Sequence, residues 1–242
     1  MTLPAYIIHL ERAKSRRPQA EALRAWLGPA AQILPAVDGQ ILSDSNIAHV
    51  LGPCRATRYP FPLRPAEIAT FLSHRKCWQR LLEDGHEAAL IVEDDIATTA
   101  TFSPACALAL EQIVQGQFVR FPGKKREAGE VLAAADGVEL FRPQRVALGM
   151  LAQIVTREAA ARLLAASTVF DRPVDTFLQL RWVHGADVVS VWPSGISEIS
   201  ADLGGSTIHA NMPWPTKLRR EILRPLYRLS IRLQSDRHNN AS

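Results

Sequence analysis

The chain has 242 residues, of which 47% are hydrophobic and 21% charged, with a net charge of +4. These values are typical of one globular domain or a domain with a tail, and no stretch approaches the roughly 18 apolar residues of a membrane-spanning helix. Residues 217–242 contain seven Lys or Arg and two acids, a net +5, which leaves residues 1–216 near −1. This asymmetry argues against a nucleic-acid-binding core and indicates a basic appendage.

Apolar runs alternate with amphipathic segments along the chain. The expected strands cover residues 6–10, 32–37, 88–92, 118–121, 138–141, 148–155 and 188–192. The expected helices cover residues 12–26, 66–84, 102–114, 157–166 and 176–182, with Thr156 as an N-cap. Residues 40–65, 122–137 and 193–216 are expected to be loops or surface excursions, and 138–141 is expected to pair with 148–155. Such alternation predicts an α/β fold with a largely parallel sheet.

The most informative segment is the acidic tripeptide Glu93-Asp94-Asp95, which follows the apolar run 88–92. Ligands of open α/β sheets bind beyond the carboxyl ends of the strands. Clustered carboxylates at such an end indicate a divalent metal that holds a phosphate-bearing ligand. The alternative is a solvated acidic turn.

The sequence lacks the common cofactor and nucleophile signatures, including GxGxxG, GxxxxGK[ST], GxSxG and HExxH. Cys54, Cys77 and Cys106 have no metal-binding spacing, and an odd number of cysteines fits reduced thiols in a cytoplasm. The apolar stretch 5–10 is too short for a signal peptide, and basic residues follow it. We therefore expect a cytoplasmic protein.

Six short motifs follow one another over about residues 5–210. They are Tyr6-Ile7-Ile8-His9-Leu10 with Arg16-Arg17 downstream, Ala36-Val37-Asp38-Gly39, Glu67-Ile68-Ala69-Thr70-Phe71-Leu72-Ser73-His74 with Trp78, Leu90-Ile91-Val92-Glu93-Asp94-Asp95-Ile96, Gly149 to Leu164, and Pro173-Val174-Asp175. In this order they resemble the motifs of glycosyltransferase family 25, the bacterial lipooligosaccharide galactosyltransferases and their relatives. The chain departs from the family pattern at His9, Ala66, Ala69, Met150 and Gln153. These departures leave room for an inactive relative.

The resemblance implies a GT-A type, Rossmann-like mostly parallel sheet flanked by helices, a nucleotide-sugar donor and an inverting mechanism. A divalent cation, Mn²⁺ or Mg²⁺, would stabilise the leaving diphosphate. We expect Asp95 to ligate the metal directly, Asp94 to contact the metal or the ribose, and Glu93 to point back into the fold. The base that takes the acceptor proton is expected to be Asp175, whose alternative role is a helix N-cap, and Asp187 is a weaker candidate.

Further donor contacts are expected from the other motifs. The donor-binding candidates are Arg16, Arg17, Asp38, Ser73, His74 and Asp94. Each has a structural alternative: a solvated first helical turn for the arginines, a turn-holding role for Asp38, and a hydrogen-bonded core position for His74. His209, after Gly204-Gly205-Ser206, is a weaker candidate for a metal or diphosphate contact.

Residues 217–242 form a separate basic tail beyond a transferase domain of residues 1–216. Five apolar residues fall on one side of the helix expected there, and five basic residues on the other. The apolar residues are Leu218, Ile222, Leu226, Leu229 and Leu233, and the basic ones are Lys217, Arg220, Arg224, Arg228 and Arg232. The pattern indicates a helix that lies on an anionic membrane. The alternative is a helix packed on the domain with a solvated basic face.

Together these observations predict an inverting transferase that moves a hexose, galactose above all, from a UDP-sugar to a lipid-linked oligosaccharide. The expected setting is lipopolysaccharide, lipooligosaccharide or related surface-glycan synthesis at the inner face of the cytoplasmic membrane, with no nucleic acid as partner. The alternatives are a catalytically degenerate saccharide- or membrane-binding relative and a metal-dependent phosphohydrolase.

Overall fold

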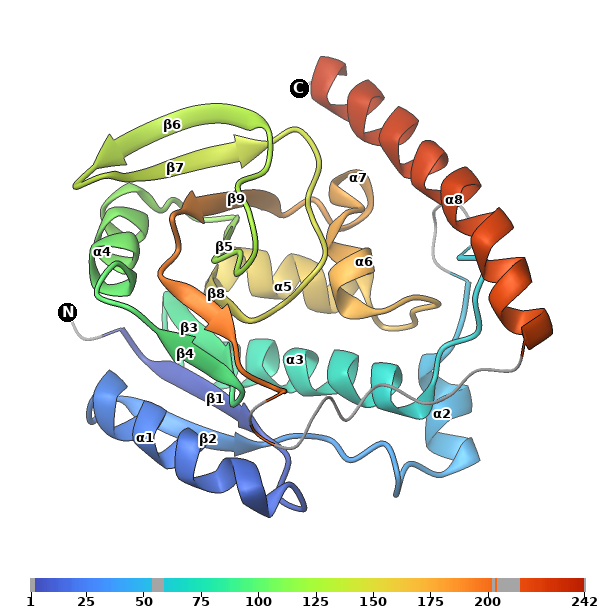
Figure 1. Cartoon of the computed structure of the whole chain (residues 1–242), viewed down its shortest axis with the longest axis horizontal. Coiled ribbons are helices and arrows are strands. Elements are labelled where there is room, and N and C mark those ends of the chain that lie inside the picture. Colours follow the sequence, from blue (N-terminus) through green and yellow to red (C-terminus); the bar gives the residue numbers. More distant parts are fainter. Residues whose placement is uncertain (1–2, 54–58, 202, 204–213, 242) are drawn as a thin grey trace.

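The computed structural model describes residues 3–53, 59–201, 203 and 214–241. Within this part of the chain, an eight-stranded sheet in the order β2-β1-β3-β8-β5-β9-β7-β6 forms the centre of the molecule (Figure 1). Its strands are β1 (Ala5–His9), β2 (Ala31–Pro35), β3 (Ala88–Glu93), β5 (Gln117–Arg120), β6 (Gly129–Ala135), β7 (Val138–Pro143), β8 (Ala152–Thr156) and β9 (Asp187–Trp192). A separate antiparallel pair consists of β4 (Ile96–Thr98) and β10 (Ile196–Glu198).

Most strands of the sheet run in one direction. β1 is parallel to β2 and β3, and β5 is parallel to β9. β8 lies antiparallel between β3 and β5, and β7 lies antiparallel between β9 and β6. The mostly parallel sheet flanked by helices confirms the α/β class and is consistent with a Rossmann-like, GT-A type fold.

Helices cover both faces of the sheet. They are α1 (Arg17–Leu27, after the 3-10 turn Lys14–Arg16), α2 (Asp44–Val50), α3 (Pro65–Glu83), α4 (Phe102–Gln112), α5 (Arg157–Ala166), α6 (Val174–Leu178), α7 (Arg181–His184) and α8 (Trp214–Ala241). One apolar core lies between the sheet and α3, α5 and α6, and a second lies between the sheet and α1 and α4. Tyr6 points into the first core and Ile7 into the second, as alternation along a strand requires.

Several local expectations are confirmed and others are wrong. Thr156 caps α5, because its side chain accepts a hydrogen bond from the Ala159 N–H. The expected pairing of 138–141 with 148–155 is wrong, since β7 pairs with β6 and β9 while β8 pairs with β3 and β5. Strand β6 was expected to be an excursion. It forms the outer strand of the sheet and is largely exposed, so it lacks the apolar alternation that marks a buried strand.

Helix α8 packs along the outside of the domain (Figure 1). Its domain-facing side chains include Tyr227, Ile231 and Ser235, which are 9%, 5% and 2% exposed. Pro225 lies inside the helix. Among the described helices, none combines the length and apolar character needed to cross a membrane. The tail is therefore helical as expected, but it is packed against the rest of the chain along one side.

Candidate active site

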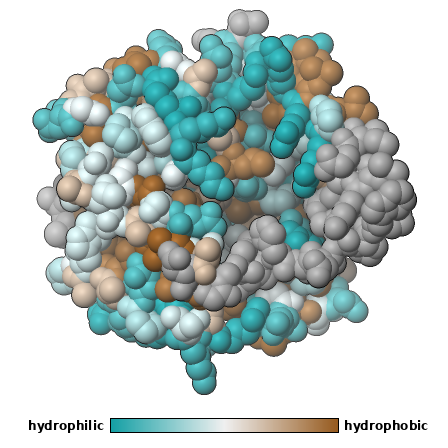
Figure 2. Space-filling view, viewed as in Figure 1, coloured by the Kyte–Doolittle hydropathy of each residue, from teal (hydrophilic) through white to brown (hydrophobic). Residues whose placement is uncertain are grey.

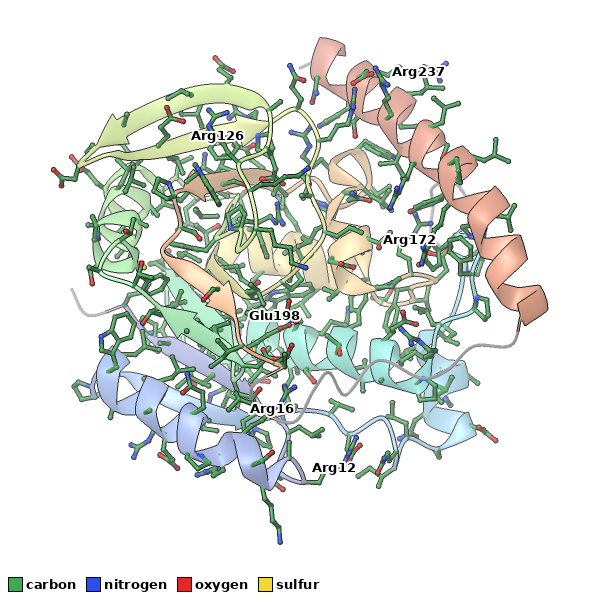
Figure 3. All side chains as sticks on the ribbon, in the orientation of Figure 1. Arg12, Arg16, Arg126, Arg172, Glu198 and Arg237 are labelled. Carbon is green, nitrogen blue, oxygen red and sulfur yellow. The ribbon has the colours of Figure 1, made fainter. Side chains whose placement is uncertain are left out.

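A cavity of about 580 Å³ lies at the carboxyl ends of β1 and β3. It is bounded by the segments after β1 and β2, by the first turns of α3, by the Glu93-Asp94-Asp95 tripeptide and by Glu198. Figure 3 shows Arg12, Arg16 and Glu198 in the same region of the molecule, where β10 approaches the start of α1. A more open hollow of about 740 Å³, beside the β6–β7 turn and Trp192, lacks such a cluster of buried carboxylates. We therefore place the candidate site at the first cavity.

Arg16 binds both aspartates of the tripeptide. Its Nη1 lies 3.2 Å from Asp94 Oδ1 and 2.9 Å from Asp95 Oδ2. His9 Nδ1 lies 2.6 Å from the other oxygen of Asp94, Oδ2. Asp94 and Asp95 are only 5% and 8% exposed. Asp94 thus has a protein partner at each oxygen, whereas Asp95 Oδ1 is buried and has no hydrogen-bond partner among the described residues.

The environment of Asp95 disfavours its charge. Burial, together with the neighbouring charges of Glu93, Asp94 and Glu198, raises the pKa of the Asp95 carboxyl to about 6 against the opposing effect of Arg16. A carboxylate in this position would be stabilised by additional positive charge. Around Asp95, the negative charge of the neighbouring carboxylates therefore exceeds the positive charge that Arg16 supplies.

The donor set around Asp95 fits a metal that a substrate would help to hold. Among the described residues, no group of three or more His, Cys, Asp or Glu is arranged to hold a metal by itself. Mg²⁺ commonly binds through one or two carboxylates and substrate phosphates and keeps several waters. The partnerless Asp95 oxygen fits such a site, with Glu93 and Glu198 as further oxygen donors on the same cavity wall. Asp94 is better suited to fixing Arg16 and His9.

Glu93 differs from the expectation that it points back into the fold. It lines the cavity, and its Oε1 lies 3.5 Å from His74 Nε2. Strand β3 ends at Glu93. The alternation of side chains along the strand therefore does not determine where Asp94 and Asp95 point relative to Glu93. Gln153 lies 3.0 Å from the other ring nitrogen of His74, Nδ1. His74 therefore connects the cavity to the sheet core through Gln153, and Gln153 is a position at which the sequence departs from the family pattern.

Ser73 and Asp38 shape the cavity wall. The Ser73 hydroxyl accepts a hydrogen bond from the Val37 N–H and donates one to the Ala69 carbonyl. Asp38 accepts from the Gln40 N–H and from Arg12 Nε. A Cβ on Gly39 would lie 2.7 Å from the Pro65 carbonyl oxygen, so the loop can approach α3 this closely only with glycine there. These contacts match the turn-holding role of Asp38 and fasten the 36–40 loop to α3.

The two neighbouring arginines have different positions. Arg16 is buried in the cavity, whereas Arg17 forms an ion pair with Glu21 on the exposed side of α1 and is absent from the cavity wall. Arg17 therefore occupies the solvated position that was the alternative for it. Arg12 and Arg64 line the cavity and were not singled out from the sequence. Their loops fold toward the carboxyl ends of β1 and β3, and this arrangement, which no local sequence pattern indicates, makes them cavity residues.

The two carboxylates expected as candidate bases, Asp175 and Asp187, lie at opposite edges of the sheet. Asp175 accepts hydrogen bonds from the Gly149 N–H and the Thr176 N–H. It is not among the residues that line the cavity, but it lies at the same edge of the sheet as Asp95, because the Gly149 loop enters β8 beside the end of β3. Asp175 is not the N-cap of α6, which is Pro173.

Asp187 lies at the opposite edge of the sheet, at the start of β9. Burial raises its pKa, but hydrogen bonds from Arg142 and Gln117 outweigh burial and leave the pKa lowered. This position and these partners indicate a structural carboxylate.

Glu198 is a site residue that the sequence pattern did not reveal. It lines the cavity and is paired opposite Ile96, next to Asp95, by the β4–β10 ladder. The Ile199 N–H donates to the Asp95 carbonyl over 2.8 Å and fixes the two segments together. Since β4 and β10 are separated by about a hundred residues of chain, only the folded arrangement brings this carboxylate to the tripeptide. His209 and the Gly204-Gly205-Ser206 segment lie outside the described residues.

A family model described as "Glycosyltransferase family 25 (LPS biosynthesis protein)" matches residues 2–130. The chain belongs to glycosyltransferase family 25. The matched part contains β1, α3 and the acidic tripeptide, which are the elements that build most of the cavity. The motif resemblance is therefore confirmed at the level of the family.

Three relatives illustrate the range of this family. A glycosyltransferase 25 family member of Anopheles gambiae is 31% identical over 183 residues, which cover 72% of this chain and 31% of the relative. The inactive glycosyltransferase 25 family member 3 of Mus musculus is 26% identical over 208 residues, covering 81% and 35%. The procollagen galactosyltransferase 1 of Danio rerio is 24% identical over 187 residues, covering 73% and 31%. The chain thus spans about a third of the length of these relatives.

Proposed function

We propose that this family 25 glycosyltransferase moves a hexose, with galactose expected, from a UDP-sugar to a lipid-linked oligosaccharide by an inverting mechanism. The observation that carries the proposal is Asp95, a buried carboxylate in a cavity at the carboxyl ends of parallel strands, one oxygen of which has no hydrogen-bond partner within the described part of the chain. A galactosyltransferase among the relatives supports the choice of sugar. The family description as an LPS biosynthesis protein supports the choice of acceptor.

The cavity offers both signs of charge that a nucleoside diphosphate and its metal require. Arg12, Arg16 and Arg64 supply cationic side chains on its wall, and Glu93, Asp95 and Glu198 supply oxygen donors. A bound Mn²⁺ or Mg²⁺ would neutralise charge on the diphosphate as it leaves. Asp95 would be its direct protein ligand in this proposal. Asp94, through its contacts with His9 and Arg16, would hold the arginine in position.

Two carboxylates compete for the role of base. Asp175 is held at both oxygens by N–H groups, at the same edge of the sheet as Asp95, and a fixed orientation suits proton transfer. Glu198 is favoured by its position on the cavity wall itself. We propose Asp175 as the base, because Glu198 lies among the carboxylates that already crowd Asp95. The acceptor hydroxyl would then approach from the β8 side of the cavity.

A degenerate binding protein is the second candidate. The mouse relative is called inactive, and this chain departs from the family pattern at Met150 and Gln153. Gln153 contacts His74, so one departure reaches the cavity wall. Family membership favours glycosyl transfer over phosphoester hydrolysis, the third alternative.

Calorimetry and donor hydrolysis would test the proposal. Purified protein with Mn²⁺ is expected to bind UDP and to release UDP slowly from UDP-galactose or UDP-glucose, and Asp95→Asn is expected to lose both. Asp136→Asn, at the exposed β6–β7 turn, is the matched control and should behave like the wild type. Binding without turnover of any UDP-sugar would identify the degenerate relative. Phosphate release from simple esters, without UDP release, would identify a phosphohydrolase.

A further inference from the structure

Helix α8 carries a leucine stripe that faces away from the domain. We define the stripe as Leu226, Leu229 and Leu233, whose side chains are 61%, 51% and 50% exposed. At 100° per residue these leucines fall within about 60° of one another. Tyr227 and Ile231, which are buried against the domain, lie on the opposite side of the helix. In Figure 2, hydrophobic atoms are visible at the upper right, where α8 runs in Figure 1.

The orientation of α8 is fixed by polar contacts as well as by packing. The Tyr227 hydroxyl accepts a hydrogen bond from the fully buried Arg172, over 2.9 Å. Asn239, three turns further along, bonds to Arg181 over 2.6 Å and to the Gln144 carbonyl over 3.1 Å. Figure 3 shows Arg172 beside α8. A helix held near its middle and near its end cannot turn its leucines inward without breaking these contacts.

The stripe is bordered by cationic residues. By helical angle, Arg232 lies about 60° and Arg228 about 100° from Leu229 on one side, and Arg237 lies about 20° from Leu226 on the other. Asp236 lies between Arg232 at 4.0 Å and Arg145 at 3.5 Å. The three arginines outnumber this acid, so positive charge is in excess along residues 226–237. An exposed apolar stripe with arginines beside it is typical of a helix that lies in the interface of an anionic bilayer.

We propose that the leucine stripe of α8 docks on an anionic lipid bilayer, with the helix axis parallel to the membrane surface. The leucines would enter the boundary between headgroups and acyl chains, and the flanking arginines would contact lipid phosphates. We choose a bilayer as the occupant because the arginines beside the leucine stripe complement the negative charge of anionic headgroups. The inference concerns α8 alone and does not require the transfer reaction, although a bilayer is where a lipid-linked acceptor would be found.

Vesicle co-sedimentation of the full chain tests this proposal without any donor. The protein is expected to bind vesicles of phosphatidylglycerol and phosphatidylcholine much more strongly than vesicles of phosphatidylcholine alone. Leu226→Glu with Leu229→Glu should weaken that binding about tenfold or more, because it removes apolar burial and adds negative charge. Leu110→Glu, which places the same change on the exposed side of α4 where Leu110 is 39% exposed, should leave binding unchanged.

A second variant and a second measurement keep the outcomes distinct. Arg228→Gln with Arg232→Gln should remove the preference for phosphatidylglycerol while leaving the leucines in place. Equal vesicle binding by the wild type and the leucine variant would overturn the proposal. A wild-type dimer that the leucine variant converts to a monomer, with no vesicle binding by either, would identify a second copy of the chain as the occupant and would equally overturn it. Since vesicle binding is scored without a UDP-sugar, failure here is independent of failure in the donor assays.

Discussion

Arg16 and Asp95 form a buried ion pair, with Arg16 Nη1 2.9 Å from Asp95 Oδ2, at the wall of the candidate donor cavity. The pair leaves half of the carboxylate unsatisfied, because no described residue forms a hydrogen bond with the other oxygen of Asp95. Burying a carboxylate that is only half satisfied costs free energy of folding. Retaining such a group is a pattern expected of a site that binds a cation or substrate, where stability is exchanged for function.

Asp95→Asn is expected to stabilise the protein at neutral pH. Burial and the neighbouring carboxylates raise the pKa of the folded Asp95 carboxyl to about 6, from 3.8 for an ordinary aspartate, so the folded state holds this proton more tightly than the unfolded state does. Stability of the wild type should therefore fall as pH rises from about 4 to about 6 and should not recover above that window. The variant lacks this loss and should gain about 1–3 kcal/mol at pH 7.

Urea denaturation across that pH window measures the difference between wild type and variant. The gain should shrink as pH falls and should vanish by about pH 3, below the unfolded-state pKa, where the wild-type carboxyl is protonated in both states. Asp136→Asn, on the exposed turn, should show no comparable pH-dependent gain. An Asp95→Asn protein that is less stable than the wild type at pH 7 would mean that the carboxylate contributes to folding and is not a strained functional group.

Arg16→Met is expected to destabilise the protein by about 3–5 kcal/mol, because two buried carboxylates lose their shared cation. Arg17→Met is the matched control. Arg17 pairs with Glu21 on the exposed side of α1, and exposed pairs contribute at most about 1 kcal/mol. Denaturant titration of Arg16→Met, of Asp95→Asn and of the double variant gives the coupling free energy between Arg16 and Asp95. The same measurement on Arg17→Met provides the control. If the double variant is no more stable than Arg16→Met alone, Arg16 does not act by compensating Asp95.

The fold was largely predictable from the sequence because its buried strands are apolar and its helices are amphipathic. β3 and α3 were predicted nearly to the residue, since each combines a continuous apolar pattern with a clear ending at Gly85 or at the tripeptide. β6 and β10 were missed for the opposite reason. They are short or exposed, and pairing with a neighbour stabilises them more than their own pattern does.

The candidate site was predictable only where its residues follow strand ends in sequence. Asp94 and Asp95 are found this way, and Arg16 follows β1 closely enough to be suspected. Glu198 required knowledge of the β4–β10 pairing, which no local pattern encodes. Adjacent residues such as Arg16 and Arg17 diverge because the turn of a helix separates neighbours by about 100°, and the entry angle of α1 decides which of them enters the cavity.

Glu127→Gln is expected to destabilise the segment that carries Gly149. The buried Glu127 carboxylate lies 2.6 Å from Arg120 Nη1 and accepts hydrogen bonds from the Ala147 N–H and the Ser190 hydroxyl. The amide would leave Arg120 as an uncompensated buried cation, at a cost of about 3–5 kcal/mol. Glu130→Gln is the control, since its carboxylate is 74% exposed and lies 4.0 Å from Arg142.

Limited proteolysis of residues 144–151, together with urea denaturation, would measure this effect. Faster cleavage in that segment is expected for Glu127→Gln and not for Glu130→Gln. Equal cleavage of the two variants would show that the Glu127 ion pair does not hold the loop against the sheet.

The choice between Asp175 and Glu198 as base predicts different kinetic effects. Asp175→Asn is expected to lower kcat for glycosyl transfer about 10²- to 10⁴-fold while UDP affinity in Mn²⁺ stays close to that of the wild type. Its asparagine can still accept a hydrogen bond from Gly149 through the amide oxygen, so the loop should keep its place. Glu198→Gln is expected to change UDP affinity in Mn²⁺ more than kcat, because Glu198 shares the cavity wall with Asp95.

Steady-state kinetics and calorimetry on the two variants, each with its unfolding midpoint checked, would decide between the carboxylates. The reverse pattern, with kcat lost in Glu198→Gln and retained in Asp175→Asn, would reassign the base to the β10 residue. That result would also move the acceptor. A hydroxyl activated by Glu198 must enter between β10 and the start of α1, whereas one activated by Asp175 must enter past the Gly149 loop at the end of β8.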